Sequence, residues 1–418
     1  MKVSGKRMFE MLKKLNFERL STFEGEKKGA EIIANEIKAL GIEPVIETFK
    51  APHYEIKTAK FEVLEPKYKE YTVSGFGFSG NDAKDGIEAG FIYIENLDEL
   101  CLRNASGKIA VLNTGIGDET FKKLKEAGVV GVVCPSGTVY DKTSETDLDE
   151  RMLRSRHTAN GVLPAVSMRI KDILSLVNSK PTRVKITLEQ EEGEGDSQNI
   201  IAEIKGTEKP EEVIVYTAHY DSVVFSHGVF DNASGSVMIM EMLRYFAAKP
   251  PKRTVRFIWC GSEERGLLGS KAYVAAHEEE LKNIRLCINI DMVGVALGRD
   301  VWRVTGEESF VAAVQYLYKE VGFPMTVYQD IYSSDTIPFA DKGIPGLNVI
   351  RNAAQGAAQI HCRRDVIEIM SAEALENTCS FLALLSDKLV NAVVFPVEKK
   401  IPANIVEKVD KYLLKKKN

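Results

Sequence analysis

The sequence has no long apolar run. A membrane-spanning helix needs ~20 consecutive, mostly apolar residues, and no stretch approaches that length. The first twenty residues carry charges throughout and lack an apolar centre, so they do not read as a signal peptide. They predict an amphipathic helix with Met8, Leu12 and Leu15 on one stripe. We therefore expect a cytoplasmic protein without a membrane partner.

Cysteine and excess charge are also scarce. No two cysteines have the spacing of a zinc knuckle or a redox motif, which argues against a disulfide framework and a thiolate metal site. The 55 basic and 60 acidic residues give a net charge of -5. This balance offers no general electrostatic reason to bind nucleic acid, so we expect no nucleic-acid partner.

The second half of the chain alternates short apolar runs with helical patterns. Such alternation predicts an α/β fold with a mostly parallel central sheet flanked by helices. The expected strands are Val213–Thr217, Thr254–Trp259, Arg285–Ile290 and Gly346–Ile350. The expected helices are about Ala233–Ala247, Ser270–Ala276, Ser309–Val321 and Ala372–Leu389.

The length of 418 residues favours more than one domain. Residues 53–192 have a different sequence pattern from their flanks. They end in the acidic stretch EEGEGDSQ, which we interpret as a linker. We predict that 1–52 and 193–395 fold together around an inserted, smaller β-rich α/β domain, 53–192. Residues 396–418, which contain Lys399, Lys400 and Lys415–Lys417, are expected to form a basic C-terminal tail ending in a solvated helix.

Two motifs follow the first expected strand. In VIVYTAHYDS, His219 and Asp221 are two residues apart and face the same way on an extended segment. His219 could therefore bind a metal while Asp221 orients its ring, although a structural histidine is equally compatible. In GVFDNASG, Asp231 is either a helix N-cap or a carboxylate that bridges two metals.

Three further motifs follow the later strands. Glu263 and Glu264 diverge in direction, so one could bind metal while the other faces a water, or both could lie in a surface turn. Asp291 follows an apolar strand, where a buried acid needs a partner such as a metal. His361 lies in the loop motif QIHCRRD, and taken alone it favours a structural role.

Taken together, the motifs indicate a metal centre. Four of the five follow strand ends or begin the next helix, where open α/β sheets place ligand sites. Two Zn2+ ions, three carboxylates and a bridging hydroxide would sum to zero charge, which stabilises hydroxide at neutral pH. Imidazole and carboxylate ligands without thiolate suit catalytic zinc.

The motif set resembles the di-zinc aminopeptidase family that includes bacterial leucyl aminopeptidases, aminopeptidase Y and glutamate carboxypeptidase II. The matching motifs, in the family's order, are AHYDS, GVFDNASG, SEERGLLGS, NIDMVG, SSDTIPFADKGIPG and IHCRRD. The resemblance implies a zinc-dependent peptidase with two Zn2+ per chain. It also implies that the inserted block is similar to the protease-associated domain of many relatives.

The resemblance also implies a role for each site residue. His219 and Asp291 would bind one zinc, Glu264 and His361 the other, and Asp231 would bridge them, with Asp221 as the orienting acid and Glu263 as the general base. One motif departs from the family, because Thr336 stands where many relatives have histidine. That change affects the substrate pocket and removes no ligand.

The expected reaction is hydrolysis of N-terminal residues from peptides. Tyr332 is a candidate oxyanion donor, with packing against the sheet as the alternative. An aminopeptidase must hold a free ammonium, for which Asp330 or Asp335 is a candidate. A carboxypeptidase or dipeptidase must hold a carboxylate, which suits arginine, and Arg351, Arg363 and Arg364 are candidates for that role.

A non-catalytic, receptor-like module is the remaining alternative. The sequence of such a module would lack the general base or some of the metal ligands. Glu263 and every ligand position are retained, which favours an enzyme.

Overall fold

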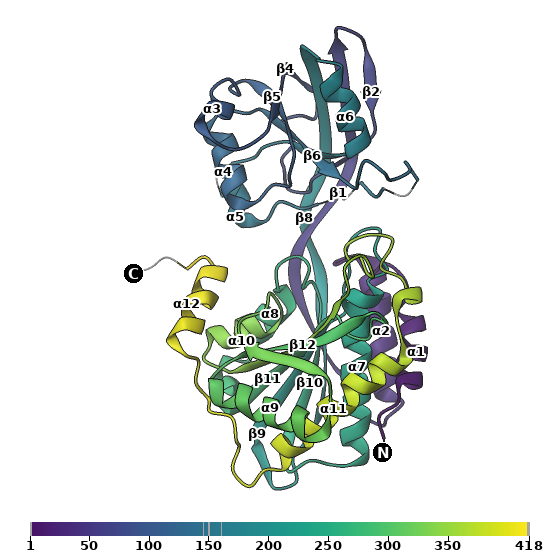
Figure 1. Ribbon diagram of the computed structural model, residues 1–418, viewed down its shortest axis with the longest axis vertical. Helices are drawn as coiled ribbons and strands as arrows, with labels where there is room; N and C mark the ends of the chain where they lie inside the picture. The colour runs from purple at the N-terminus through teal and green to yellow at the C-terminus, as the bar shows by residue number, and fades with distance from the viewer. Residues whose placement is uncertain (1, 145, 149–150, 160, 416–418) are drawn as a thin grey trace. The chain divides into compact units, whose positions relative to one another are not determined.

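The apolar runs predicted as strands form the centre of a sheet in the computed structural model, which describes residues 2–144, 146–148, 151–159 and 161–415. The chain divides into unit 1, Met1–Ala51 with Gly195–Asn418, and unit 2, Pro52–Glu194 (Figure 1). Each unit has cores of its own, so they are described separately.

The sheet of unit 1 has the strand order β13-β12-β14-β11-β9-β10-β8. The four strands from β14 to β10 run parallel, whereas β12 is antiparallel to β14 and β8 is antiparallel to β10. The strands are β8 (Arg183–Ile204), β9 (Lys209–His219), β10 (Arg253–Cys260), β11 (Ile284–Ile290), β12 (Gly298–Thr305), β13 (Met325–Gln329) and β14 (Gly346–Val349), with β15 (Arg351–Ala353) beside β12.

Alternating side chains of these strands build a core on each face of the sheet. Tyr216 and Phe257 belong to the core that contains α1 (Gly5–Lys14), α2 (Glu24–Lys38), α7 (Ser234–Ala248), α9 (Glu308–Val321) and α11 (Ala372–Asn391). Val215 and Ile258 face the core of α8 (Leu268–Ala276) and α10 (Thr336–Asp341). The predicted α/β class, a central sheet flanked by helices, is confirmed (Figure 1).

The N-terminal stretch is helical, as its apolar stripe predicts. Ser4 caps α1 by accepting a hydrogen bond from the backbone N–H of Arg7 at 3.3 Å. Met8 and Leu12 are fully buried beneath this helix. Among the described residues, no helix combines the length and apolarity that crossing a bilayer requires.

Within unit 2 the strand order is β8-β4-β5-β6-β7-β3, which continues from the long strand β8. Its strands are β1 (Val45–Glu65), β2 (Lys69–Tyr71), β3 (Val73–Gly75), β4 (Ile87–Ile94), β5 (Lys108–Leu112), β6 (Gly131–Ser136) and β7 (Ala165–Arg169). Its helices are α3 (Glu99–Leu102), α4 (Asp118–Glu126), α5 (Ser155–Thr158) and α6 (Ile170–Asn178). The predicted likeness to a protease-associated domain stays a prediction.

Two expectations from the sequence are wrong. The stretch 191–198, interpreted as a linker, lies inside the long strand β8, which pairs with β1. The described part of the C-terminal tail is not solvated along its length, because α12 (Ala403–Tyr412) buries Ile405 and Val409 in a small core that also contains Ile337. Lys416 and Lys417 lie outside the described residues.

Candidate metal centre

Three parallel strands deliver site residues to one edge of the sheet of unit 1. His219 is the last residue of β9, and it pairs with Cys260 at the end of β10. Glu263 follows in the turn after β10, and Asp291 follows directly after β11. The carboxyl ends of parallel strands meet at one edge, which explains why residues far apart in sequence converge here.

The converging side chains form two groups that share one residue. His219 Nε2 lies 3.2 Å from Asp231 Oδ1 and 3.6 Å from Asp291 Oδ1. His361 Nε2 lies 3.1 Å from Asp231 Oδ2 and 3.0 Å from Glu264 Oε1. Asp231 therefore presents one oxygen to each histidine. The five predicted ligands come together in these two groups, each of which could hold a metal ion, and Glu263 forms a third such group with His219 and Glu264.

Asp231 is held from both sides by hydrogen bonds. Asp365 accepts from the N–H groups of Phe230 at 2.7 Å and Asp231 at 3.0 Å. On the other side, Asn232 Nδ2 donates to the carbonyl of Ile290, the residue before Asp291, at 2.9 Å. The sequence motifs contained Asp365 and Asn232, but no pattern in them indicated these contacts.

Asp221 positions the turn that carries the two glutamates. Its Oδ1 accepts from the N–H of Glu263 at 3.0 Å, and its Oδ2 accepts from the N–H of Glu264 at 3.2 Å. His219 Nδ1 lies 3.4 Å from Asp221 Oδ1, which is longer than most N–H···O hydrogen bonds. Asp221 thus contacts the predicted histidine, and it bonds more closely to the glutamate turn.

The two histidines lie in a strongly negative environment. Burial lowers the pKa of His219, but the carboxylates around it, Glu263 foremost, raise it well above its usual value. Burial likewise lowers the pKa of His361, and Glu264 and Asp231 raise it to about 11. Such a cluster of carboxylates attracts cations.

The pKa values of two acids in the centre are shifted in opposite directions. Burial raises the pKa of Asp231, but its hydrogen bonds to the two histidines outweigh burial and lower it below its usual range. Burial raises the pKa of Glu263 well above its usual value. A carboxylate whose protonated form is favoured in this way suits a proton-transfer role.

Tyr332 lies close to the carboxylates of the centre. Burial raises its pKa, and the negative charges of Asp291 and Asp231 raise it further. The guanidinium of Arg303 lies over its ring, 4.8 Å from the ring centroid. The structure therefore places the candidate oxyanion donor within electrostatic range of the centre.

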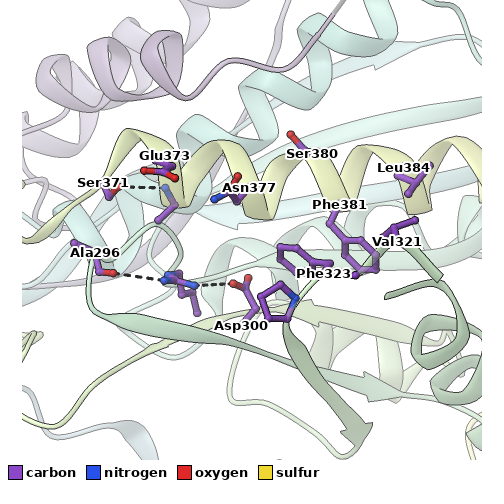
Figure 2. A pocket seen from close by; sticks show the side chains of 14 residues that line it. Ala296, Asp300, Val321, Phe323, Ser371, Glu373, Asn377, Ser380, Phe381 and Leu384 are labelled. Atoms are coloured by element: carbon purple, nitrogen blue, oxygen red, sulfur yellow. Dashed lines mark hydrogen bonds and ion pairs between the residues drawn. The ribbon is translucent and has the colours of Figure 1, made fainter. Parts of the chain in front are cut away.

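Most of the residues proposed to bind the charged end of a substrate already bind other groups of the protein. Arg351 donates to Asp300 and to the carbonyl of Val295, both at 2.8 Å. It lines a separate cavity of about 640 Å³, where Figure 2 shows Asp300 beneath the helix that carries Ser371. Lys408 forms an ion pair with Asp330 at 2.7 Å.

Two further candidate anchors differ in exposure. Arg364 Nη1 donates to Gln359 Oε1 at 2.9 Å in the exposed loop next to His361. Asp335 is 1% exposed, and burial raises its pKa to about 6. A carboxylate that is so deeply buried does not present itself to a substrate ammonium.

Comparison with known proteins gives a consistent answer. Residues 199–385 match the model of peptidase family M28. Over 404 residues the chain is 29% identical to aminopeptidase YwaD of Bacillus subtilis, covering 91% of this chain and 82% of the relative. It is 24% identical to bovine carboxypeptidase Q over 88% of this chain and 81% of that protein.

The fold is likewise similar to a solved structure. BSAP, described as a zinc aminopeptidase from Bacillus subtilis, superposes with a TM-score of 0.79 at 24% identity, over 96% of this chain and 99% of the other. The resemblance predicted from the motifs is confirmed, because residues 199–385 match the model of peptidase family M28. The predicted class of enzyme, a peptidase, is confirmed with it.

Proposed function

We propose that this chain is an aminopeptidase that holds two zinc ions and removes N-terminal residues from peptides. One observation carries the proposal: the carboxylate of Asp231 faces His219 with one oxygen and His361 with the other. A carboxylate shared between two imidazole groups is suited to bridging two metal ions. A single-metal site would use only one of the two groups.

The residues present fit zinc chemically. Each group joins one imidazole to two carboxylates, and such donors bind zinc while leaving a position for substrate. Asp291 Oδ1 is buried and has no hydrogen-bond partner within the described part of the chain. An unsatisfied buried carboxylate oxygen costs free energy, and a bound cation would remove that cost. His219, Asp231 and Asp291 would hold one ion, and Asp231, Glu264 and His361 the other.

The proposed reaction uses residues of this chain around the metals. Zinc supplies a Lewis acid that polarises the peptide carbonyl and makes water more acidic. Glu263 accepts the proton of the attacking water on its carboxylate and returns it to the leaving amine nitrogen. Tyr332 donates its O–H to the oxyanion that forms at the carbonyl. Asp221 holds the N–H of Glu263 and so fixes the direction of that carboxylate.

Whether the chain removes N-terminal or C-terminal residues depends on which end of the peptide the site can bind. Arg351, a candidate for a substrate carboxylate, is already bonded to Asp300 and a carbonyl. The relative YwaD is named an aminopeptidase, and others are named carboxypeptidase Q, so carboxypeptidase action is the second candidate. The retained Glu263 argues against a receptor-like module. Cytoplasmic residence and the absence of a nucleic-acid partner stay predictions.

A pair of peptides tests the direction. The zinc-loaded protein is incubated with a short peptide that begins with leucine and with the same peptide acetylated at its N-terminus. Release of leucine from the free-amine peptide alone is expected for an aminopeptidase. Release of the C-terminal residue from both peptides would replace the proposal with a carboxypeptidase. No cleavage of either would contradict general peptide hydrolysis.

A further inference from the structure

The α1–α2 connector contains a buried arginine with an unusual set of partners. Arg19 is 0% exposed, and no carboxylate oxygen of the described residues lies within ion-pair distance of it. Its guanidinium donates instead to backbone carbonyls, at 2.5 Å to Tyr220, 2.8 Å to Phe17, 2.5 Å to His227 and 2.8 Å to Gly228, and also to Leu15. Arginine alone offers five donors in a planar fork, so no other side chain satisfies this set.

These contacts fix both ends of the loop between two site residues. Tyr220 follows His219 directly, and Gly228 lies three residues before Asp231. The backbone adds a further link, because the N–H of Arg19 donates to Ser222 Oγ at 2.9 Å and Ser222 donates back to the carbonyl of Arg19 at 3.0 Å. A residue 200 positions away thus sets the path of the chain from one proposed ligand to the next.

A second buried charge at the start of α2 holds the neighbouring turn. Glu26 is 0% exposed, and its Oε1 accepts from the N–H of Ser262 at 3.1 Å and from Ser197 Oγ at 2.8 Å. Ser262 has a φ of +52° and directly precedes Glu263. The neighbouring Gly261 leaves room for the carboxylate, because a Cβ there would lie 2.9 Å from Glu26 Oε1.

We propose that the segment Phe17–Glu26, here called the N-terminal brace, is a positioning device for the metal centre. Arg19 holds the His219–Asp231 loop, and Glu26 holds the turn that leads into Glu263 and Glu264. Within the described part of the chain, neither residue forms a hydrogen bond or ion pair with a proposed ligand side chain, so both hold the site through backbone groups, and the charge of Arg19 also acts on Asp231 from a longer distance. The inference rests on the proposed zinc function. The brace also lies outside residues 199–385, the region that matches the family model.

The expected consequence is weaker metal binding when the brace is removed. Outer partners of metal ligands typically change metal affinity by about 10- to 100-fold. We expect Arg19→Met to weaken the binding of zinc by about that factor. Arg19→Lys keeps the charge but loses most of the five carbonyl contacts. Its zinc affinity should therefore lie between that of the wild type and that of Arg19→Met. Glu26 Oε2 accepts from the N–H of Thr22 at 2.7 Å while Oε1 accepts from that of Ser262, so Glu26→Gln places an NH2 group against a backbone N–H and should weaken zinc binding by about 10-fold.

Two buried residues away from the centre provide matched controls. Arg253 is also 0% exposed and also donates to backbone carbonyls, those of Val390 and Ala392, in addition to an ion pair with Glu212. Glu241 is 0% exposed and accepts from the N–H of Ser4 at 2.8 Å. Arg253→Met and Glu241→Gln therefore report the general cost of disturbing a buried charge.

The experiment measures zinc dissociation constants of full-length variants by competition with a chromophoric chelator, together with the Tm of each metal-free protein. Loss of zinc affinity in the brace variants beyond that of Tm-matched controls supports the proposal. Zinc affinity equal to that of the controls would overturn it, and Arg19→Lys decides the matter if Arg19→Met does not fold. A wild-type chain that binds no pair of zinc ions would overturn the proposed function itself.

Discussion

At the scale of single residues, Glu263 and Glu264 lie next to each other in one turn, and we propose a different role for each. Glu264 Oε1 lies 3.0 Å from His361 Nε2, whereas Glu263 Oε2 lies 3.9 Å from His219 Nε2. Both are held by the same acid, Asp221. The longer distance fits the proposal that Glu263 transfers protons and that Glu264 is a ligand.

The separation of tasks predicts the effect of Glu263→Gln. The amide cannot accept a proton from water, so kcat should fall by at least about 10²- to 10⁴-fold. Metal content, measured by mass spectrometry of the metal-loaded protein, should not change. Glu279→Gln, an exposed position in unit 1, is the control. A variant that loses zinc together with activity would mean that Glu263 is a ligand.

Tyr332→Phe tests the oxyanion donor. Removing one donor from a transition-state site typically lowers kcat by about 10²-fold or more, with a smaller effect on KM. Tyr316, 71% exposed, supplies the control Tyr316→Phe. Steady-state kinetics on a leucine-leading peptide separates the two constants. Unchanged kcat would assign Tyr332 to packing, the alternative that the sequence left open.

At the scale of elements, the C-terminal helix contributes to the stability of unit 1. Ile405 is fully buried on one side of α12, while Val406 is 41% exposed on the other. Ile405→Ala should lower the free energy of unfolding by about 2–4 kcal/mol, because it leaves a cavity against α10. Val406→Ala on the same helix should lower the free energy of unfolding much less. Urea unfolding measures both, and equal losses would mean that α12 does not pack as described.

The start of α2 gives the stability of the metal-free protein a pH dependence. Burial raises the pKa of Glu26 to about 7 in the folded chain, against an ordinary value of 4.5. The folded state therefore binds more protons than the unfolded state between these values. The stabilising effect is complete below pH ~4.5 and is lost as the pH rises through ~7.

Glu26→Gln removes this titration. The difference in unfolding free energy between wild type and variant should grow, in favour of the wild type, by an amount on the order of 3 kcal/mol as the pH falls from 8 to 5. Urea unfolding at several pH values measures it. A difference that stays constant with pH would show that Glu26 does not titrate in this range.

Elements with strong patterns were predictable from the sequence, and those with weak ones were not. The strand expected at Thr254–Trp259 is found as Arg253–Cys260, because it is a continuous buried run. By contrast, β12 contains Arg299, Asp300 and Arg303 among its apolar residues and was not predicted. Asp300 is tolerated there because Thr378 and Arg351 satisfy its carboxylate.

At the scale of the whole molecule, the residues of the candidate site were more predictable from the sequence than the residues that hold them in place. The five proposed ligands lie in short local motifs at strand ends, at the start of a helix or in a loop after a strand, and such motifs are visible in sequence. Arg19, Glu26 and Asp365 bind backbone groups that lie far away in the sequence, for example 236 positions for Ser262 and 134 positions for Asp231. Contacts of that kind leave no spacing pattern, so only a structure reveals them.

The most direct test of the shared-carboxylate centre is a zinc titration of the metal-free chain followed by isothermal calorimetry. The wild-type chain should bind two equivalents of zinc, and His361→Ala should bind one tightly, because His219, Asp231 and Asp291 remain as a complete group. One tight equivalent in the wild type, or two in His361→Ala, would contradict the proposal that Asp231 joins two zinc sites.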